Sequence, residues 1–155
     1  MVDNKMKMEI MAKLENVSVV RVAISSFVSN LNITIDELMD IKTAVSEAVT
    51  NAIEHGYEIT EEEQEGEDMV VVEATIQEGE RDRVQIVIRD EGIGIEDVSL
   101  AMTPAYTSKP ELEHAGMGFT IMETFMDEII IDSTKDQGTS ITLTKSLKKR
   151  KSSHA

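Results

Sequence analysis

The chain has 155 residues, of which 41% are hydrophobic and 29% charged, enough for one folded domain with a core. Its formal net charge of −15 argues against nucleic acid as a direct partner, and it means that an anion site would need local positive potential. The sequence has no Cys and no apolar run long enough for a membrane span, a composition that fits a cytoplasmic protein.

The first half of the chain predicts one strand and two helices. Polar and apolar residues alternate over 6–14, which indicates a half-buried strand. Asn16 is a candidate N-cap for a helix that reaches about residue 30. Thr34, with Glu37 three residues later, forms a capping-box pattern, and we expect it to open a long helix that ends near Glu54.

The second half predicts two hairpins, a long loop and one helix. Because hairpins dominate and no series of βαβ units is present, we expect an α+β fold with one domain over 1–146. It would be a two-layer sandwich with helices on one face of a mixed, mostly antiparallel sheet. The predicted segments are an acidic loop (57–68), a hairpin (69–77 with 83–89), a glycine loop (90–95), a lid-like loop (96–115), a helix (116–127), a second hairpin (129–132 with 139–144) and a basic flexible tail (147–155).

The acidic loop is the most charged part of the chain. Residues 58–68 hold seven carboxylates and no basic side chain. A solvated loop is the expected structure, and a docking surface for a basic partner is the alternative.

The long helix carries the first group of candidate functional residues. In the segment EAVTNAIEH (47–55), the residues Glu47, Asn51 and His55 share one polar stripe of the helix. The Asn51 oxygen suits a hard cation such as Mg²⁺, and Glu47 could accept a proton from an attacking hydroxyl. The alternative is an ordinary surface stripe, with His55 interacting with the helix dipole.

Two glycine turns carry the second group. In DEGIGI (90–95), Asp90 follows a strand, and its carboxylate could accept a hydrogen bond from the exocyclic amine of adenine, with Gly92 and Gly94 allowing close approach. In GMGF (116–119), Gly116 and Gly118 open a helix whose N–H groups and dipole would face an anion. Taken separately, each segment is also compatible with a simple turn.

Taken together, these motifs resemble those of the ATP-binding superfamily of gyrase B, histidine kinases and MutL, known as GHKL, over about residues 6–145. The order is Glu-x-x-x-Asn on a helix, Asp-x-Gly-x-Gly after a strand, and Gly-x-Gly before a helix. The segments VSEAVTNAIEHGY (45–57), TSKPELE (107–113) and GMGFTIME (116–123) are similar to those of the anti-sigma factor serine kinases that act in sporulation. The resemblance implies the Bergerat ATP-binding fold.

The resemblance also implies a function and partners. Members of this family are dimers that hold a sigma factor away from RNA polymerase, and they use Mg-ATP to phosphorylate a serine on an anti-anti-sigma protein. The similarity favours a sporulation sigma factor of the sigma F type, with no direct contact to nucleic acid or membrane. Two alternatives remain: an anti-sigma binding module that holds ATP or ADP with little or no transfer, and the equivalent kinase for a general stress sigma factor.

By motif position, the resemblance implies roles for individual residues. Glu47 corresponds to the general base, Asn51 to the Mg²⁺ ligand and Asp90 to the adenine-recognising carboxylate. Arg21 corresponds to a residue that contacts the protein partners. The remaining nucleotide-binding positions are Gly92, Gly94 and Thr139 around the adenine, and Thr107, Ser108, Lys109, Gly116, Met117 and Gly118 around the phosphates.

One position departs from the family pattern. Where the family usually has an Arg two residues before the second glycine turn, this chain has His114. A His is only partly charged near pH 7 and lacks the bidentate geometry of Arg. If His114 contacts the γ-phosphate, phosphoryl transfer should be slower or more dependent on pH.

Overall fold

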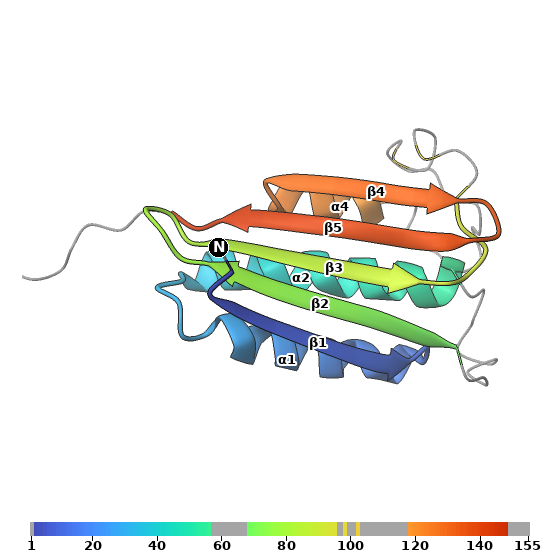
Figure 1. Ribbon diagram of the computed structural model, residues 1–155, viewed down its shortest axis with the longest axis horizontal. Coiled ribbons are helices and arrows are strands. Elements are labelled where there is room, and N and C mark those ends of the chain that lie inside the picture. Colours follow the sequence, from blue (N-terminus) through green and yellow to red (C-terminus); the bar gives the residue numbers. More distant parts are fainter. Residues whose placement is uncertain (1, 57–67, 96–97, 99–101, 103–117, 149–155) are drawn as a thin grey trace, which may run out of the picture.

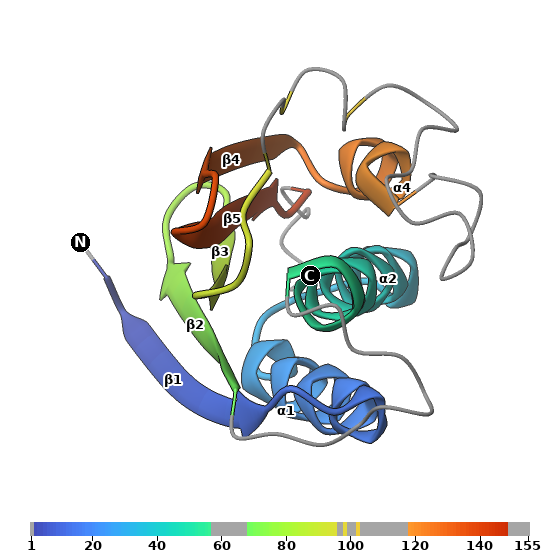
Figure 2. The ribbon, with the colours of Figure 1, turned by 90° about the vertical axis from the view of Figure 1, so that its right-hand side faces the viewer.

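In the part of the chain that the structure describes, the protein forms two layers, a five-stranded sheet and three α-helices that cover one of its faces (Figures 1 and 2). The computed structural model describes residues 2–56, 68–95, 98, 102 and 118–148. The strands are β1 (Asn4–Met11), β2 (Met69–Gln77), β3 (Arg83–Asp90), β4 (Glu128–Thr134) and β5 (Gly138–Ser146), and the helices are α1 (Val17–Val28), α2 (Ile35–Asn51) and α4 (Gly118–Phe125). The expected α+β sandwich with helices on one face is confirmed.

The sheet has the strand order β1-β2-β3-β5-β4, and each of the four pairings between described strands is antiparallel. The mostly antiparallel sheet expected from the sequence is confirmed. The parallel pair that a mixed sheet would contain is not found among the described strands, because β3 pairs with β5 in the antiparallel direction. Both predicted hairpins are present, as β2 with β3 and β4 with β5.

Strict alternation of side chains separates the two faces of the sheet. In β2, the residues Val70, Val72, Ala74 and Ile76 are buried, and the residues between them are half-buried. This is the pattern of a strand with one face against the helices and the other toward solvent. The buried hydrophobic residues of the described chain are Ile, Val, Leu, Ala and Met, in keeping with an aromatic content of 3%.

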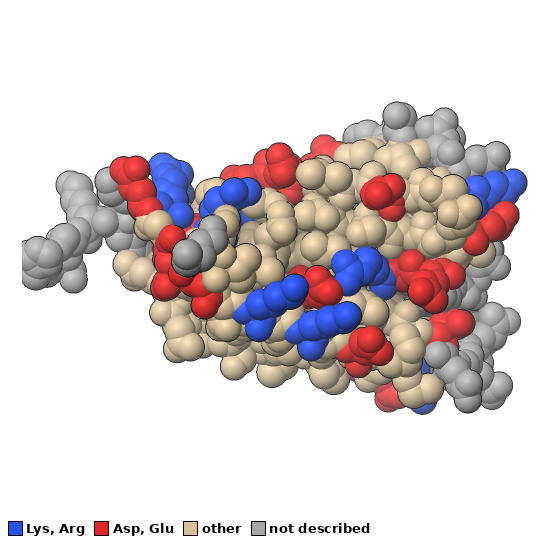
Figure 3. Space-filling model, in the orientation of Figure 1, with Lys and Arg blue, Asp and Glu red and all other residues tan. Residues whose placement is uncertain are grey.

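The open face of the sheet carries a small group of charges over β1 to β3 (Figure 3). Arg89 Nη2 lies 2.6 Å from Glu73 Oε1, and Lys7 Nζ lies 3.8 Å from the same oxygen. The hydrogen bond from Arg89 holds the pKa of the Glu73 carboxyl below its usual value. These partly exposed pairs contribute little to stability, so the helix-covered face supplies most of it.

The N-cap predicted from the sequence forms at the start of α2 but not at the start of α1. The predicted capping box of α2 is confirmed: Glu37 N donates to Thr34 Oγ1, and Thr34 N donates to Glu37 Oε1, both at 3.0 Å. Asn16, in contrast, makes no side-chain cap to α1. A 3₁₀ turn over Leu14–Asn16 precedes that helix, and the Asn16 amide instead donates to Met11 O at 3.0 Å.

The end of α2 also differs from the prediction of an uninterrupted helix to about Glu54. The α-helix ends at Asn51, and a π-helical turn over Ala52–Gly56 continues it. Ala52 and Ile53 remain buried in this turn. A π turn is wider than an α turn and is often found at functional sites. Here it begins directly after Asn51, one of the candidate site residues.

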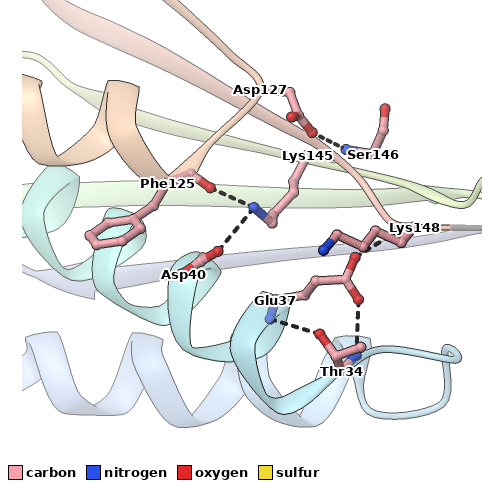
Figure 4. A network of polar contacts seen from close by, with 8 residues as sticks. All are labelled: Thr34, Glu37, Asp40, Phe125, Asp127, Lys145, Ser146 and Lys148. Carbon is pink, nitrogen blue, oxygen red and sulfur yellow. Dashed lines mark hydrogen bonds and ion pairs between the residues drawn. The ribbon is translucent and has the colours of Figure 1, made fainter.

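A polar network closes the opposite end of the molecule, where α2 begins (Figure 4). We call it the α2 N-terminal network. Leu147, the first residue of the predicted basic tail, is buried in this region, and its backbone N–H donates to Asp82 O at 2.8 Å. The members of the network are Thr34, Glu37, Asp40, Phe125, Asp127, Lys145, Ser146 and Lys148.

No helix in the described part of the chain combines the length and the apolar character that crossing a bilayer requires.

Candidate nucleotide-binding site

The candidate residues that the structure describes gather at one end of the sheet and of α2. Asp90 is the last residue of β3 and pairs with Thr139 near the start of β5. Asn51 is the last residue of α2, and Gly118 is the first described residue of α4. The helices α2 and α4 lie side by side over this part of the sheet (Figure 2). The fold thus brings together four motif residues separated by up to 88 positions, counted from Asn51 to Thr139.

Asp90 lies on the helix-facing side of the sheet, in the same alternation as the buried Val84, Ile86 and Ile88. It is 9% exposed. Burial raises the pKa of the Asp90 carboxyl from 3.8 to about 6, against hydrogen bonds from the backbone amides of Gly92 and Thr139 that lower it. The first of these bonds, from Gly92 N to Asp90 Oδ1, measures 2.9 Å. A buried carboxylate whose described partners are neutral amides is well suited to accept a further donor from a ligand.

Two glycines allow the backbone segments around Asp90 to approach each other. Gly138 has φ +91°, and a Cβ on it would lie 2.2 Å from the carbonyl oxygen of Asp90. Gly94 has φ +73°, and a Cβ there would lie 2.1 Å from the carbonyl oxygen of Thr134. Neither conformation nor distance tolerates a side chain. The glycine loop after β3 is therefore packed tightly against the turn between β4 and β5.

Ser133, in β4, is a member of this site that sequence reasoning missed. Its Oγ accepts a hydrogen bond from Ile95 N at 2.7 Å, lies 2.7 Å from Thr139 Oγ1 and lies 3.1 Å from Gly138 O. The available signal was its position in the predicted second hairpin, where antiparallel pairing sets it opposite Thr139. Serine alone is too common in strands to indicate a site.

Asn51 and Gly118 join the helix motif to the second glycine turn. A Cβ on Gly118 would lie 2.9 Å from Asn51 Nδ2 and 3.2 Å from Asn51 Oδ1. The absence of a side chain on Gly118 therefore leaves room for the Asn51 amide at the start of α4. An amide oxygen beside a helix N-terminus is a suitable place for a cation that accompanies phosphate groups.

Glu47 lies on α2, one helical turn before Asn51, and is half-buried. It takes part in an interaction within the protein, so it is not an isolated charge. On the neighbouring helix α1, Arg21 is exposed, and its Nε donates to Ser46 Oγ at 2.9 Å. Ser46 directly precedes Glu47, so the predicted partner-binding residue and the predicted base lie on adjacent parts of the two helices.

Several predicted positions lie outside what the structure describes. They include the whole predicted acidic loop except Asp68, and the side chain of His55 lies outside it as well. The same holds for the candidate phosphate-binding residues Thr107, Ser108, Lys109, His114, Gly116 and Met117.

Among the described residues, no group of three or more His, Asp or Glu side chains could hold a metal ion. Mg²⁺ characteristically takes one or two protein oxygens and completes its shell with water and nucleotide phosphates. Asn51 fits that kind of site, because its side-chain amide lies beside Gly118, with Oδ1 3.2 Å from the position that a Cβ of Gly118 would take.

Comparison with known proteins places these motifs in a family. The model of the histidine kinase-like ATPase domain matches residues 10–145. An anti-sigma F factor of Clostridium perfringens (strain 13) is 54% identical over 145 residues, covering 94% of this chain and 98% of that protein. An anti-sigma F factor of Clostridium novyi (strain NT) is 52% identical over 145 residues, covering 94% and 96% of the two chains.

A solved structure supports the fold independently. The RsbU and RsbW domains of a Mycobacterium tuberculosis protein match 92% of this chain with a TM-score of 0.59 at 23% sequence identity. The present chain spans 32% of that structure. At this level of identity, the likeness shows a shared fold and nothing more.

Proposed function

The chain belongs to the histidine kinase-like ATPase family, among relatives named anti-sigma F factor, and from this premise we propose that it is an ATP-dependent serine kinase that also inhibits a sigma factor. Its partners would be a sigma factor of RNA polymerase, of the sigma F type, and an anti-anti-sigma protein that carries the substrate serine. A homodimer is part of the same proposal. The relatives' names and their near full-length similarity support it.

The observation that carries the nucleotide part of the proposal is the convergence of Asp90, Asn51 and Gly118 at one end of the molecule. Asp90 would accept a hydrogen bond from the exocyclic amine of adenine. Such a bond to a charged group contributes about 1.5–3 kcal/mol. Gly94 and Thr139 would border the same base. Guanine carries an acceptor at the position of that amine, so the carboxylate would discriminate against it.

The phosphate part of the proposal begins at α4. Asn51 would be a ligand of Mg²⁺, and the amides at the start of α4 would face the phosphates, with the positions from Thr107 to Met117 completing the lid. Magnesium, when bound, would offset the charge that develops during transfer. Gly118 supports this arrangement because it has no side chain, which leaves room for the Asn51 amide at the start of α4.

The proposed transfer is a direct displacement. The serine oxygen of the anti-anti-sigma protein forms a bond to the γ-phosphorus, the bond from that phosphorus to the bridging oxygen breaks, and ADP leaves. Glu47 accepts or orients the serine proton. Arg21 would contact the protein partners, and its link to Ser46 puts that contact next to the proposed base.

The test of the kinase uses Mg-ATP, the purified anti-anti-sigma protein and intact mass. We expect the wild-type protein to add one phosphoryl group to the partner's serine. Glu47→Ala should lower the rate by about 10²–10⁴-fold and leave ATP affinity nearly unchanged. Glu47→Gln, which keeps the size of the side chain, controls for the interactions that Glu47 makes within the fold. Transfer at the wild-type rate in both variants would refute the role of Glu47.

Two alternative functions, a nucleotide-dependent binding module and a kinase for a general stress sigma factor, predict different results. If the wild-type protein binds ATP and transfers no phosphoryl group, it is a nucleotide-dependent binding module, the reading that His114 in place of the usual Arg favours. Affinities for purified sigma factors of the sigma F type and of the general stress type would decide which pathway it serves.

A further inference from the structure

Ser133 is the centre of a small hydrogen-bonded cluster beside Asp90. Its Oγ contacts three groups from two segments, the glycine loop and the start of β5: Ile95 N at 2.7 Å, Thr139 Oγ1 at 2.7 Å and Gly138 O at 3.1 Å. Thr139 is 8% exposed, and its backbone amide donates to the Asp90 carboxylate. The cluster therefore touches both the loop that follows Asp90 and the residue that pairs with it.

The protons in this cluster can be assigned by counting donors. A serine hydroxyl has one proton to donate and two lone pairs that accept. The Ile95 N–H uses one lone pair, and the Gly138 carbonyl has no proton, so the proton between it and Ser133 must come from Ser133. The 2.7 Å contact with Thr139 can then be satisfied only if Thr139 donates its own hydroxyl proton to Ser133.

The opposite assignment leaves a contact unsatisfied. If Ser133 donated to Thr139, its oxygen and the Gly138 carbonyl oxygen would face each other at 3.1 Å with no proton between them. Two acceptors at that distance repel each other, and the cost rises in a half-buried position with reduced solvent. The satisfied arrangement directs the Thr139 proton toward Ser133 and leaves only lone pairs of Thr139 for other partners.

This arrangement makes the neighbourhood of Asp90 rich in acceptors. The ionised Asp90 carboxylate accepts only, and the Thr139 hydroxyl, held by Ser133, accepts as well. Adenine presents an amine with two N–H donors at its sixth position, whereas guanine presents a carbonyl acceptor there. A purine with a donor at that position is matched by both groups, and one with an acceptor meets repulsion from both.

We propose that Ser133 is a positioning residue of the nucleotide site, which fixes the Thr139 hydroxyl as an acceptor and thereby increases the preference for adenine over guanine nucleotides. The inference rests on the proposed function, because it takes a purine nucleotide as the ligand. Ser133 also braces the glycine loop through Ile95 N, next to Gly94, where no side chain fits against Thr134. One hydroxyl thus orients two parts of the same subsite.

The experiment compares the affinities of the full-length protein for Mg-ATP and Mg-GTP by calorimetry. In Ser133→Ala, the Thr139 hydroxyl is free to rotate and to donate to guanine, so the ratio of ATP to GTP affinity should fall by at least about tenfold. Ser133→Thr restores the hydroxyl and should return the ratio to within about threefold of wild type. Ser140→Ala is the matched control, because Ser140 neighbours Thr139 and points to the other face of the sheet.

A double-mutant cycle separates positioning from a general structural effect. In a Thr139→Val background there is no hydroxyl to orient, so Ser133→Ala should no longer change the ratio. Three results would overturn the inference. The first is a ratio of ATP to GTP affinity that is unchanged in Ser133→Ala, and the second is a ratio that is not restored in Ser133→Thr. The third is that Ser133→Ala changes the ratio equally in the Thr139→Val background. If Ser133→Ala does not fold, Ser133→Thr against wild type and the Thr139→Val variant still decide, since loss of the hydroxyl at Thr139 must itself change the ratio.

Failure of the proposed function has a different signature. A wild-type protein that binds neither nucleotide would refute the function and this inference with it. A wild-type protein that binds ATP in preference to GTP, with Ser133 variants that keep the preference, would refute the inference alone.

Discussion

The two ends of the molecule each bury a carboxylate, and the two carboxylates differ in the hydrogen-bond partners that surround them. Glu37, at the start of α2, is 4% exposed and Asp90, at the end of β3, is 9% exposed. Glu37 accepts from Thr34 N at 3.0 Å and from Lys148 N at 2.7 Å, one bond to each oxygen. Nearby, Lys145 Nζ lies 3.3 Å from Asp40 Oδ2 and donates to Phe125 O at 2.6 Å (Figure 4).

At the other end, the partners of Asp90 that the structure describes are two neutral backbone amides, and burial leaves the pKa of this carboxyl at about 6. The comparison teaches that one end holds the fold together through charges and caps that satisfy one another. The other end keeps a poorly solvated carboxylate that a ligand's amine could complete. A ligand-binding site often lowers the stability of the folded protein when the ligand is absent.

The largest effect on the free energy of unfolding should come from adding a methyl group at Gly138, which is tightly packed at the end of the molecule that holds Asp90. Gly138→Ala would set a Cβ 2.2 Å from Asp90 O at φ +91° and should lower the free energy of unfolding by about 3 kcal/mol or more. Gly79→Ala, in the turn at the opposite end, is the control. Among the described residues its Cβ would meet only Arg81 O, at 3.8 Å, so the change should stay within about 0.5 kcal/mol. Urea unfolding measures both, and equal effects would contradict the packing described for Gly138.

The next largest effect comes from replacing the buried carboxylate by an amide, which should change the free energy of unfolding in opposite directions at the two ends. Since the pKa of Asp90 is raised from 3.8 to about 6 in the folded protein, its ionised form opposes folding at pH 7 by up to about 3 kcal/mol. Asp90→Asn should therefore raise the free energy of unfolding of the nucleotide-free protein while it lowers ATP affinity by about 10- to 150-fold. The same exchange at the other end, Glu37→Gln, should lower the free energy of unfolding by about 1 kcal/mol, because one of the bonds that Glu37 accepts from Thr34 N and Lys148 N is lost.

The pH dependence checks the cause of the Asp90 effect. The folded protein binds the Asp90 proton more tightly than the unfolded chain, so this group makes the free energy of unfolding fall as pH rises from about 4 to about 6. Asp90→Asn should lack that part of the curve, so the difference between the two proteins should shrink toward acid pH. A difference that is the same at pH 4 and pH 7 would show that ionisation of Asp90 is not responsible.

The smallest effect on ATP binding should come from the ion pair of the α2 N-terminal network. Lys145→Met leaves Asp40 and Phe125 O without their shared cation and should cost about 2 kcal/mol, with ATP affinity within about threefold of wild type. Lys7→Met, which removes an exposed pair with Glu73 at 3.8 Å, should change stability by less than about 0.5 kcal/mol. Thermal unfolding and calorimetry give both quantities. A large loss of ATP affinity in Lys145→Met would mean that the two ends are coupled through α4.

Features that depend on neighbouring residues could be predicted from the sequence. The capping box of Thr34 and Glu37 forms as expected, because both partners lie within one turn. The alternation in β2 and β3 likewise identifies their buried faces and places Asp90 in line with them. Asn16 shows where local reasoning ends: its amide has a competing acceptor at Met11 O, made available by the 3₁₀ turn before the helix.

By itself, the sequence determined the order of the elements, the two hairpins, the helix that carries Glu47 and Asn51, and the three motifs that resemble an ATP site. These depend on period, capping and turn chemistry over a few residues. Only the tertiary structure decided that Gly138 lies on Asp90, that Gly118 leaves room for Asn51, and that Ser133 holds Thr139. Those contacts depend on the antiparallel register of β3, β5 and β4 and on the packing of α4 against α2, which join residues far apart in the chain.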